Sequence, residues 1–188
     1  MSIAIIGSGN MGKGLAARLS SRKDVTLATR ATTDKAIRDA DIIVLAVPYA
    51  AALEIAARAD LSGKIVIDMT NALNPDFSGL LLGHTSSAAE EIQSRATGAK
   101  VVKAFNTIFA SLLGKPASAT ANIPVFLAGN DGAAVDTVAD LVKQAGFTPE
   151  KTGTLDAARL IEPLGMLNIR FGYGLGKGTD IAPTWVTL

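Results

Sequence analysis

The stretch from Ile3 to Gly12 constrains the fold more than any other part of the sequence. It opens with apolar residues, Ile3 to Ile6, which indicate a strand buried on both faces. Glycines follow at the G-x-G-x-x-G spacing, and apolar residues at helical spacing come next. Such a turn is typical of dinucleotide-binding folds, because the helix N-terminus presents free N–H groups to a pyrophosphate. We therefore predict that a dinucleotide contacts Gly7, Ser8, Gly9, Asn10, Met11 and Gly12.

Each glycine has its own purpose in a turn of this kind. Gly7 permits the tight turn, Gly9 lets the backbone approach the pyrophosphate, and Gly12 lets the helix pack closely on the strand. The alternative is a glycine turn that binds nothing. The sequence predicts a strand before the glycines and a helix after them, and this context favours a dinucleotide-binding turn over that alternative.

The composition limits the functions open to the chain. Its 188 residues are enough for one domain with a small appendage, and 48% of them are hydrophobic. The net charge is +1 and the sequence has no run of basic residues, so it predicts no surface that would bind nucleic acid. The absence of cysteine excludes disulfides and thiol chemistry. The lone histidine, His84, predicts no metal site. With no signal-peptide pattern and no membrane-spanning apolar stretch, a cytoplasmic protein is expected.

Alternating apolar runs and helical patterns predict an α/β protein. Beyond the first strand, apolar runs predict strands at residues 25–29, 42–46, 65–68, 101–105 and 124–128. Spacing and capping signals predict helices at residues 49–58, from Ser87 onwards, at 133–144 and at 155–171. We predict a Rossmann-type, doubly wound, mainly parallel sheet with a small C-terminal helical cap.

The end of the second predicted strand indicates which dinucleotide is bound. NAD enzymes place an acidic residue there for the ribose hydroxyls, whereas this sequence has Thr29 and Arg30. An arginine fork can hold a 2′-phosphate, and Lys35 could add a second positive charge. A solvated loop arginine is the alternative, but the position favours phosphate recognition. The predicted cofactor is NADP(H).

Only residues 31–40 separate this point from the third predicted strand, which leaves room for one or two helical turns. We expect a stunted segment that lacks the usual second Rossmann helix. Other residues at strand ends complete the predicted cofactor site, although capping or turn bonding explains Asn71 almost as well. These residues are Ala46, Val47, Pro48, Asn71, Ala104 and Asn106.

A run of further stretches carries a resemblance to a known family. The stretches are Gly7–Gly12, Thr29–Arg30, Ala46–Pro48, Asp68–Asn71, Ser86–Glu90, Val101–Thr107, Ala128–Asp131 and Ala158–Glu162. On these the sequence resembles the F420-dependent NADP oxidoreductase family over nearly its whole length. The resemblance implies a Rossmann domain with a small C-terminal cap, usually in a dimer, that carries hydride between NADP(H) and a deazaflavin. Two departures are the short segment after Arg30 and Asn106, which stands where archaeal members carry a histidine.

Hydride transfer between two stacked rings needs proximity, with the reacting carbons roughly 3–3.5 Å apart, and no nucleophile. We therefore expect no catalytic side chain, and an acceptor pocket with apolar walls that include Leu164 and Leu167, for which core packing is the alternative. Arg170 could meet an anionic substrate or cap helix carbonyls. The predicted acceptor pocket comprises Asn106, Thr107, Ile108, Met166 and Arg170.

The prediction is an NADP(H)-dependent oxidoreductase that transfers hydride between NADPH and a deazaflavin (F420-like) or flavin-like acceptor. Residues 1–146 are expected to form the NADP-binding Rossmann domain, and residues 147–188 the cap that completes the acceptor site. The expected partners are a small-molecule redox acceptor and a second copy in a homodimer, with neither nucleic acid nor membrane. The alternatives are a non-catalytic NADP(H)-sensing dimer and a flavin-mediated metal-ion or quinone reductase.

Overall fold

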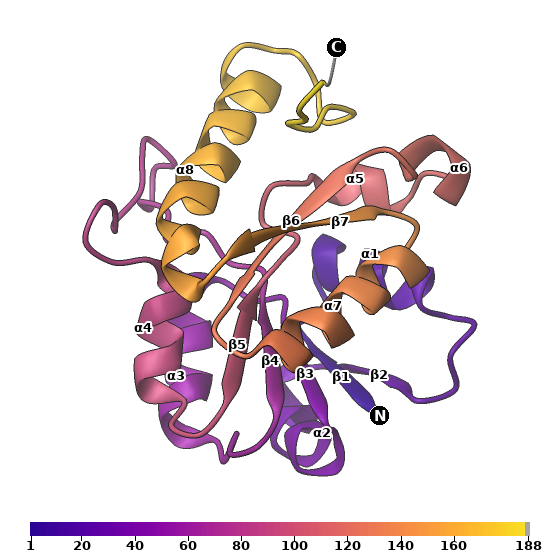
Figure 1. Ribbon diagram of the computed structural model, residues 1–188, viewed down its shortest axis with the longest axis vertical. Helices are drawn as coiled ribbons and strands as arrows, with labels where there is room; N and C mark the ends of the chain where they lie inside the picture. The colour runs from indigo at the N-terminus through magenta and orange to yellow at the C-terminus, as the bar shows by residue number, and fades with distance from the viewer. Residues whose placement is uncertain (187–188) are drawn as a thin grey trace.

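A seven-stranded sheet runs through the centre of the computed structural model, which describes residues 1–186 (Figure 1). The strand order is β2-β1-β3-β4-β5-β6-β7, and every neighbouring pair is parallel except β5 with β6. The predicted Rossmann-type, mainly parallel α/β fold is therefore confirmed. The strands are β1 (Ile3–Ile6), β2 (Val25–Ala28), β3 (Ile42–Leu45), β4 (Ile65–Asp68), β5 (Lys100–Lys103), β6 (Pro124–Gly129) and β7 (Thr148–Gly153).

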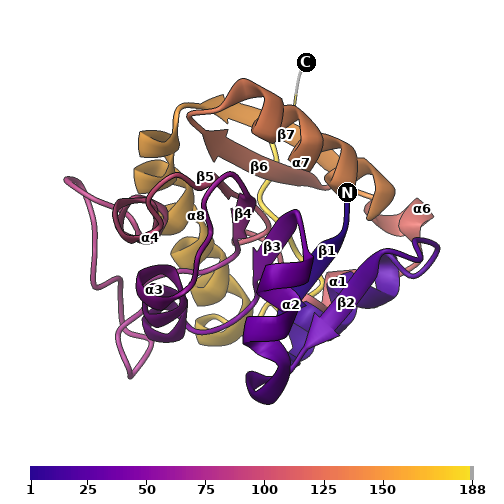
Figure 2. The same ribbon diagram turned by 90° about the horizontal axis from the view of Figure 1, so that it is seen from below.

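Helices cover both faces of this sheet, because its central strands are apolar on both sides. One core cluster packs α2, α3 and α4 on one face, and another packs α1, α5 and α7 on the other. Figure 2 shows α3 and α4 on the side of the sheet opposite α7. The helices are α1 (Asn10–Arg18), α2 (Thr33–Asp39), α3 (Tyr49–Arg58), α4 (Ala88–Arg95), α5 (Ala110–Leu113), α6 (Ala117–Thr120), α7 (Gly132–Gln144) and α8 (Ala158–Ile169), with short helical turns η1 (Arg30–Thr32), η2 (Leu155–Ala157) and η3 (Arg170–Gly174).

The chain changes direction in the sheet next to β1, and this creates the crevice where open α/β sheets bind ligands. From β1 the chain adds β2 on one side and then crosses to β3 on the other. Ile6 pairs with Leu45 at the carboxyl ends of β1 and β3. The glycine turn after β1 and the Ala46–Pro48 segment after β3 therefore start side by side.

The segment after β2 contains a short helix, which corrects the expectation that the second Rossmann helix is absent. α2 has 7 residues, and its buried Ala36 and Ile37 pack on the sheet. Two apolar side chains at adjacent positions are enough to dock two helical turns. The segment is thus shortened but keeps its helix.

Strand β7 was not among the predicted strands. Its sequence, TPEKTG, has no buried apolar side chain, because β7 pairs only with β6 and forms the edge of the sheet. The Thr148 N–H donates to the Ile123 carbonyl, so alternation along the strand turns the Pro149 nitrogen, which has no hydrogen, outward. Residues 148–153 join the sheet beyond residue 146, and the proposed division into two parts stays a prediction.

The last helix, α8, lies beyond the ends of β4 and β5, on the side of the molecule away from the N-terminus (Figure 1). Its buried stripe includes Ile161, Glu162, Gly165 and Asn168. α8 therefore covers the carboxyl ends of the central strands. Of the helices within residues 1–186, none combines the length and apolarity needed to cross a membrane.

Candidate functional site

The glycine turn after β1 is built by close backbone contacts. Gly7 has a φ of 117°, and a Cβ there would lie 2.2 Å from the Ala46 carbonyl oxygen. A Cβ on Gly12 would lie 1.8 Å from the Gly7 carbonyl oxygen. Both positions therefore require glycine for the fold itself.

Gly9 is different, because a Cβ at this position would meet nothing within 4 Å. Gly9 is the N-cap of α1, and no side chain there accepts a hydrogen bond from the first turn. Ser8, Gly9 and Asn10 are exposed, whereas Met11 packs on the core. The N-terminus of α1 is thus open to a ligand, and its unpaired N–H groups and dipole favour an anion.

Thr29 and Arg30 lie at the carboxyl end of β2, beside this turn. The Thr29 and Thr32 side chains form a reciprocal cap around the short turn η1. Arg30 is exposed, and within residues 1–186 it forms no ion pair. It lines a hollow of about 460 Å³, which we call the α2–α3 slot. The slot is lined by Ile6, Gly7, Arg30, Thr33, Val47, Pro48, Ala51, Glu54, Ile55 and Arg58.

Lys35 does not join this slot. Its Nζ forms an ion pair with Asp39 one turn later on α2, and Lys35 lines a separate hollow with Ser2 and Thr26. The second cation in the slot is Arg58, at the end of α3. No local signal in the sequence points to Arg58, because 27 residues lie between it and Arg30 and only the fold brings the two to one slot.

At the carboxyl ends of β4 and β5, two asparagines form a reciprocal pair. Asn71 Nδ2 donates to the Asn106 carbonyl at 3.0 Å, and Asn106 Nδ2 donates to Asn71 Oδ1 at 2.9 Å. Asn106 Nδ2 also lies 3.2 Å from the Ile161 carbonyl of α8. A Cβ on Gly165 would come within 2.9 Å of the Asn106 carbonyl oxygen, so only glycine lets α8 approach this closely.

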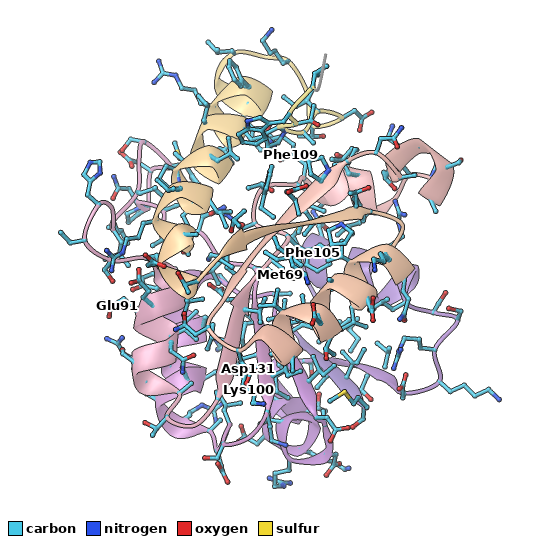
Figure 3. The ribbon with its side chains drawn as sticks, viewed as in Figure 1. Met69, Glu91, Lys100, Phe105, Phe109 and Asp131 are labelled. Atoms are coloured by element: carbon cyan, nitrogen blue, oxygen red, sulfur yellow. The ribbon has the colours of Figure 1, made fainter. Side chains whose placement is uncertain are left out.

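The residue before this pair, Phe105, has a left-handed backbone with φ of 63° although it is buried. Such a conformation costs roughly 1–3 kcal/mol and is typical of functional sites. Figure 3 shows Phe105 with Met69 in the centre of the molecule, where both belong to one core cluster. Ala104, just before Phe105, is fully buried.

Buried polar atoms without a partner gather around the same strand ends. Among the described residues, Thr70 Oγ1, Asn106 Oδ1 and Thr107 Oγ1 make no hydrogen bond. Leaving such an atom unpaired typically costs about 1–3 kcal/mol. These three atoms therefore mark a place where a polar group of a ligand would be stabilised.

The residues predicted for the acceptor pocket fall into two groups. Asn106, Thr107 and Ile108 are buried beneath α8, and Asn168 Nδ2 donates to the Thr107 carbonyl at 3.0 Å. Met166 and Arg170 instead line an open hollow of about 770 Å³, which we call the α8 hollow. Its lining is Leu73, Phe77, Ser78, Met166, Ile169, Arg170, Tyr173, Gly174 and Leu175. The structure does not join the two groups in one hollow.

An unpredicted cluster of charges lies under the site. Lys103 is fully buried, and its Nζ lies 2.6 Å from Asp68 Oδ2, 2.8 Å from Glu162 Oε1 and 2.6 Å from the Thr70 carbonyl. Glu162 also accepts hydrogen bonds from backbone N–H groups at the start of α4. One ammonium group thus lies between two carboxylates, and the cluster joins α8 to β4, β5 and α4. The sequence signal for this cluster is Lys103, a charged residue within the apolar run that predicts the strand at residues 101–105.

The comparisons with known proteins agree with this geometry. Residues 22–72 match the family described as NADP oxidoreductase, coenzyme F420-dependent. The crystal structure of a candidate F420-dependent NADP reductase from Arthrobacter sp. FB24 is 31% identical, covers 97% of this chain and 100% of its own, and has a TM-score of 0.84. The chain belongs to the F420-dependent NADP oxidoreductase family.

Two more relatives are similar to this chain over most of its length. Hypothetical protein SMa0349 of Sinorhizobium meliloti is 34% identical, with coverage of 84% of this chain and 87% of its own and a TM-score of 0.73. Metalloreductase STEAP3 of Rattus norvegicus is 31% identical over 179 residues, which cover 86% of this chain. The chain spans only 36% of the length of that curated relative. Membership places the chain among NADP-dependent oxidoreductases.

Proposed function

We propose that this protein transfers hydride between NADPH and a deazaflavin (F420-like) or flavin-like acceptor. The observation that carries the proposal is the open N-terminus of α1 at the direction change of the sheet, beside the exposed Arg30. An anion-binding helix end and a guanidinium suit the pyrophosphate and the 2′-phosphate of one dinucleotide. Family membership supports the same chemistry.

Two groups of residues, at the N-terminus of α1 and under α8, suit the binding of NADP(H). The space over Gly9 leaves the α1 backbone accessible to phosphates. Under α8, Asn106 Oδ1 and Thr107 Oγ1 are buried without partners, and a nicotinamide carboxamide offers both a donor and an acceptor for such atoms. When bound, NADPH supplies the hydride. The chain's own part is to hold the nucleotide, through Gly7–Gly12 and Arg30, and to keep water out with α8.

The acceptor is proposed to enter by the α8 hollow. Arg170, Phe77 and Tyr173 line it, so a cation lies with two aromatic rings beside an apolar floor. Planar aromatic acceptors that carry a phosphate or carboxylate suit such a surface.

The choice of cofactor is tested with Arg30→Ala. NADPH affinity should fall by about 1.5–3 kcal/mol, the range for a hydrogen bond to a charged group, while NADH affinity stays nearly unchanged. Fluorescence titration with both nucleotides measures the two values. Equal losses for NADPH and NADH would mean that Arg30 acts on the fold instead.

The acceptor is tested by stopped-flow mixing of the protein and NADPH with F420, FMN and quinones in turn. Rapid oxidation of NADPH by F420 or FMN supports the proposal. Tight NADPH binding without oxidation by any acceptor would favour the alternative of a non-catalytic NADP(H)-sensing dimer.

A second candidate function is flavin-mediated reduction of a metal ion. The similarity to Metalloreductase STEAP3 is the observation that favours it. Addition of ferric citrate to the protein with NADPH and FMN tests this candidate. Ferrous ion formed at a rate that saturates with ferric citrate supports it, whereas a rate equal to that of free reduced FMN with ferric citrate contradicts it.

We also propose that a second copy of the chain packs against α8 to form a homodimer. Leu160, Leu164, Leu167 and Phe171 recur at spacings of three and four along one side of α8 and its extension. Leu160 is 76% exposed and Leu167 is 46% exposed. Exposed leucines on one side of a helix form an apolar surface, so this side of α8 is the surface offered to a partner.

A further inference from the structure

The α2–α3 slot has a second arginine on its α3 wall. Arg58 Nη1 donates a hydrogen bond to Asp34 Oδ1 of α2 over 2.6 Å. The pair is open to solvent, since 43% of the Arg58 side chain and 63% of the Asp34 side chain are exposed. Arg30 lines the same slot from the end of β2. Two guanidinium groups from separate elements therefore border one hollow.

This arrangement has the chemistry of a phosphate site. A guanidinium carries five N–H donors in a planar fork, and the bond to Asp34 employs a single nitrogen of Arg58. The ion pair also holds the Arg58 side chain across the slot toward α2. Glu54 lines the slot and Asp34 pairs with Arg58, so two carboxylates oppose an anion, and without Arg58 the charge at the slot would be negative.

We infer that Arg58 is a specificity residue for the 2′-phosphate of NADP(H), acting together with Arg30. The inference rests on the proposed function and deepens it, since it names a residue that separates NADP(H) from NAD(H). Lys35 is the rival for this role by sequence position, but it pairs with Asp39 and lies outside the slot.

Calorimetric titration with 2′,5′-ADP and 5′-ADP tests the inference, because the two ligands differ by the phosphate and neither reacts. Arg58→Ala should bind 2′,5′-ADP about five- to twentyfold more weakly, because a charge-assisted hydrogen bond at a partly exposed site is lost. Its affinity for 5′-ADP should not change. Arg38→Ala is the matched control, because it removes an exposed arginine of α2 that does not line the slot.

The outcomes separate this inference from the proposed function. If Arg58→Ala weakens the binding of both ligands equally, or does not weaken the binding of 2′,5′-ADP, the inference about Arg58 is overturned. Binding of 2′,5′-ADP by the wild-type protein would in that case still support the proposed function. A loss in Lys35→Ala that Arg58→Ala does not share returns the role to Lys35. Wild-type protein that binds neither ligand overturns both.

Asp34→Asn provides a second measurement. Without the Asp34 carboxylate, the protein should bind 2′,5′-ADP at least as tightly as the wild type does, because a negative charge beside Arg58 has been removed. A loss as large as that of Arg58→Ala would show that the ion pair between the helices, rather than contact with the phosphate, explains the effect, and would overturn the inference.

Discussion

At the scale of single residues, Gly7 and Gly9 differ in what they contribute, although they belong to one motif. Gly9→Ala should leave the melting temperature nearly unchanged, because its backbone is extended and a methyl group there contacts nothing. NADPH should bind about tenfold more weakly or worse, because the methyl group occupies the approach of the pyrophosphate. Thermal denaturation and NADPH titration of the same preparation measure both effects.

Gly7→Ala is the matched comparison. Its positive φ and the contact with the Ala46 carbonyl predict a loss of more than about 1 kcal/mol of stability. If Gly9→Ala destabilises the protein as much as Gly7→Ala does, the space over Gly9 is not a ligand site.

The residues that the sequence did and did not reveal differ in how local their signals are. Gly7, Gly9 and Gly12 are readable because strand, turn and helix follow one another within one stretch. Local sequence does not predict which group a long side chain contacts in the same way. The position of Lys35 predicts a contact with the phosphate, whereas the structure pairs Lys35 with Asp39. Glu162 and Lys103 meet only because α8 folds back over β5.

At the scale of elements, the contact between α4 and α8 should respond to pH. The Arg159 side chain hydrogen-bonds Glu90, and this lowers the pKa of the Glu90 carboxyl below its ordinary value. A lowered pKa in the folded state means that the stabilisation is present above the ordinary pKa of about 4.3 and is lost as the pH falls through the lowered pKa. Glu90→Gln should lower the melting temperature by about 2 °C at pH 7 and have less effect at pH 3.

Arg159→Gln is the control for this pair. In that background Glu90→Gln should cost little further stability, apart from the Ser87 hydroxyl bond that Glu90 also accepts. The helix predicted from Ser87 onwards is confirmed, with Ser87 as the N-cap of α4 and its Oγ accepting a hydrogen bond from the Glu90 N–H. A difference between wild type and Glu90→Gln that is equal at pH 7 and pH 3 would contradict the assignment.

Buried elements were predicted well and edge elements poorly, for a physical reason. β3 and β4 are buried on both faces and read as continuous apolar runs. β7 has no such run, because one of its edges and most of its side chains meet water. In α2 only Ala36 and Ile37 are buried apolar residues, so the sequence predicts no more than one or two helical turns there.

At the scale of the whole molecule, the proposed dimer predicts a change of mass on substitution. Leu160→Glu with Leu167→Glu should convert dimers to monomers, because charges would replace exposed leucines on the surface offered by α8. Light scattering coupled to size exclusion measures the mass. Leu81→Glu, at an exposed leucine outside α8, is the control. A wild-type monomer at micromolar concentration would contradict the proposal.

The outward-facing nitrogen of Pro149 affects whether a strand of another molecule can add to the edge strand β7. An open edge strand is ordinarily a template onto which a foreign strand can add, and repeated addition leads to fibrils. Along β7 such a ladder would be missing a donor at its second residue. Replacement of that proline by threonine would restore the donor, and we expect faster fibrillisation of the heated protein, visible as thioflavin T fluorescence.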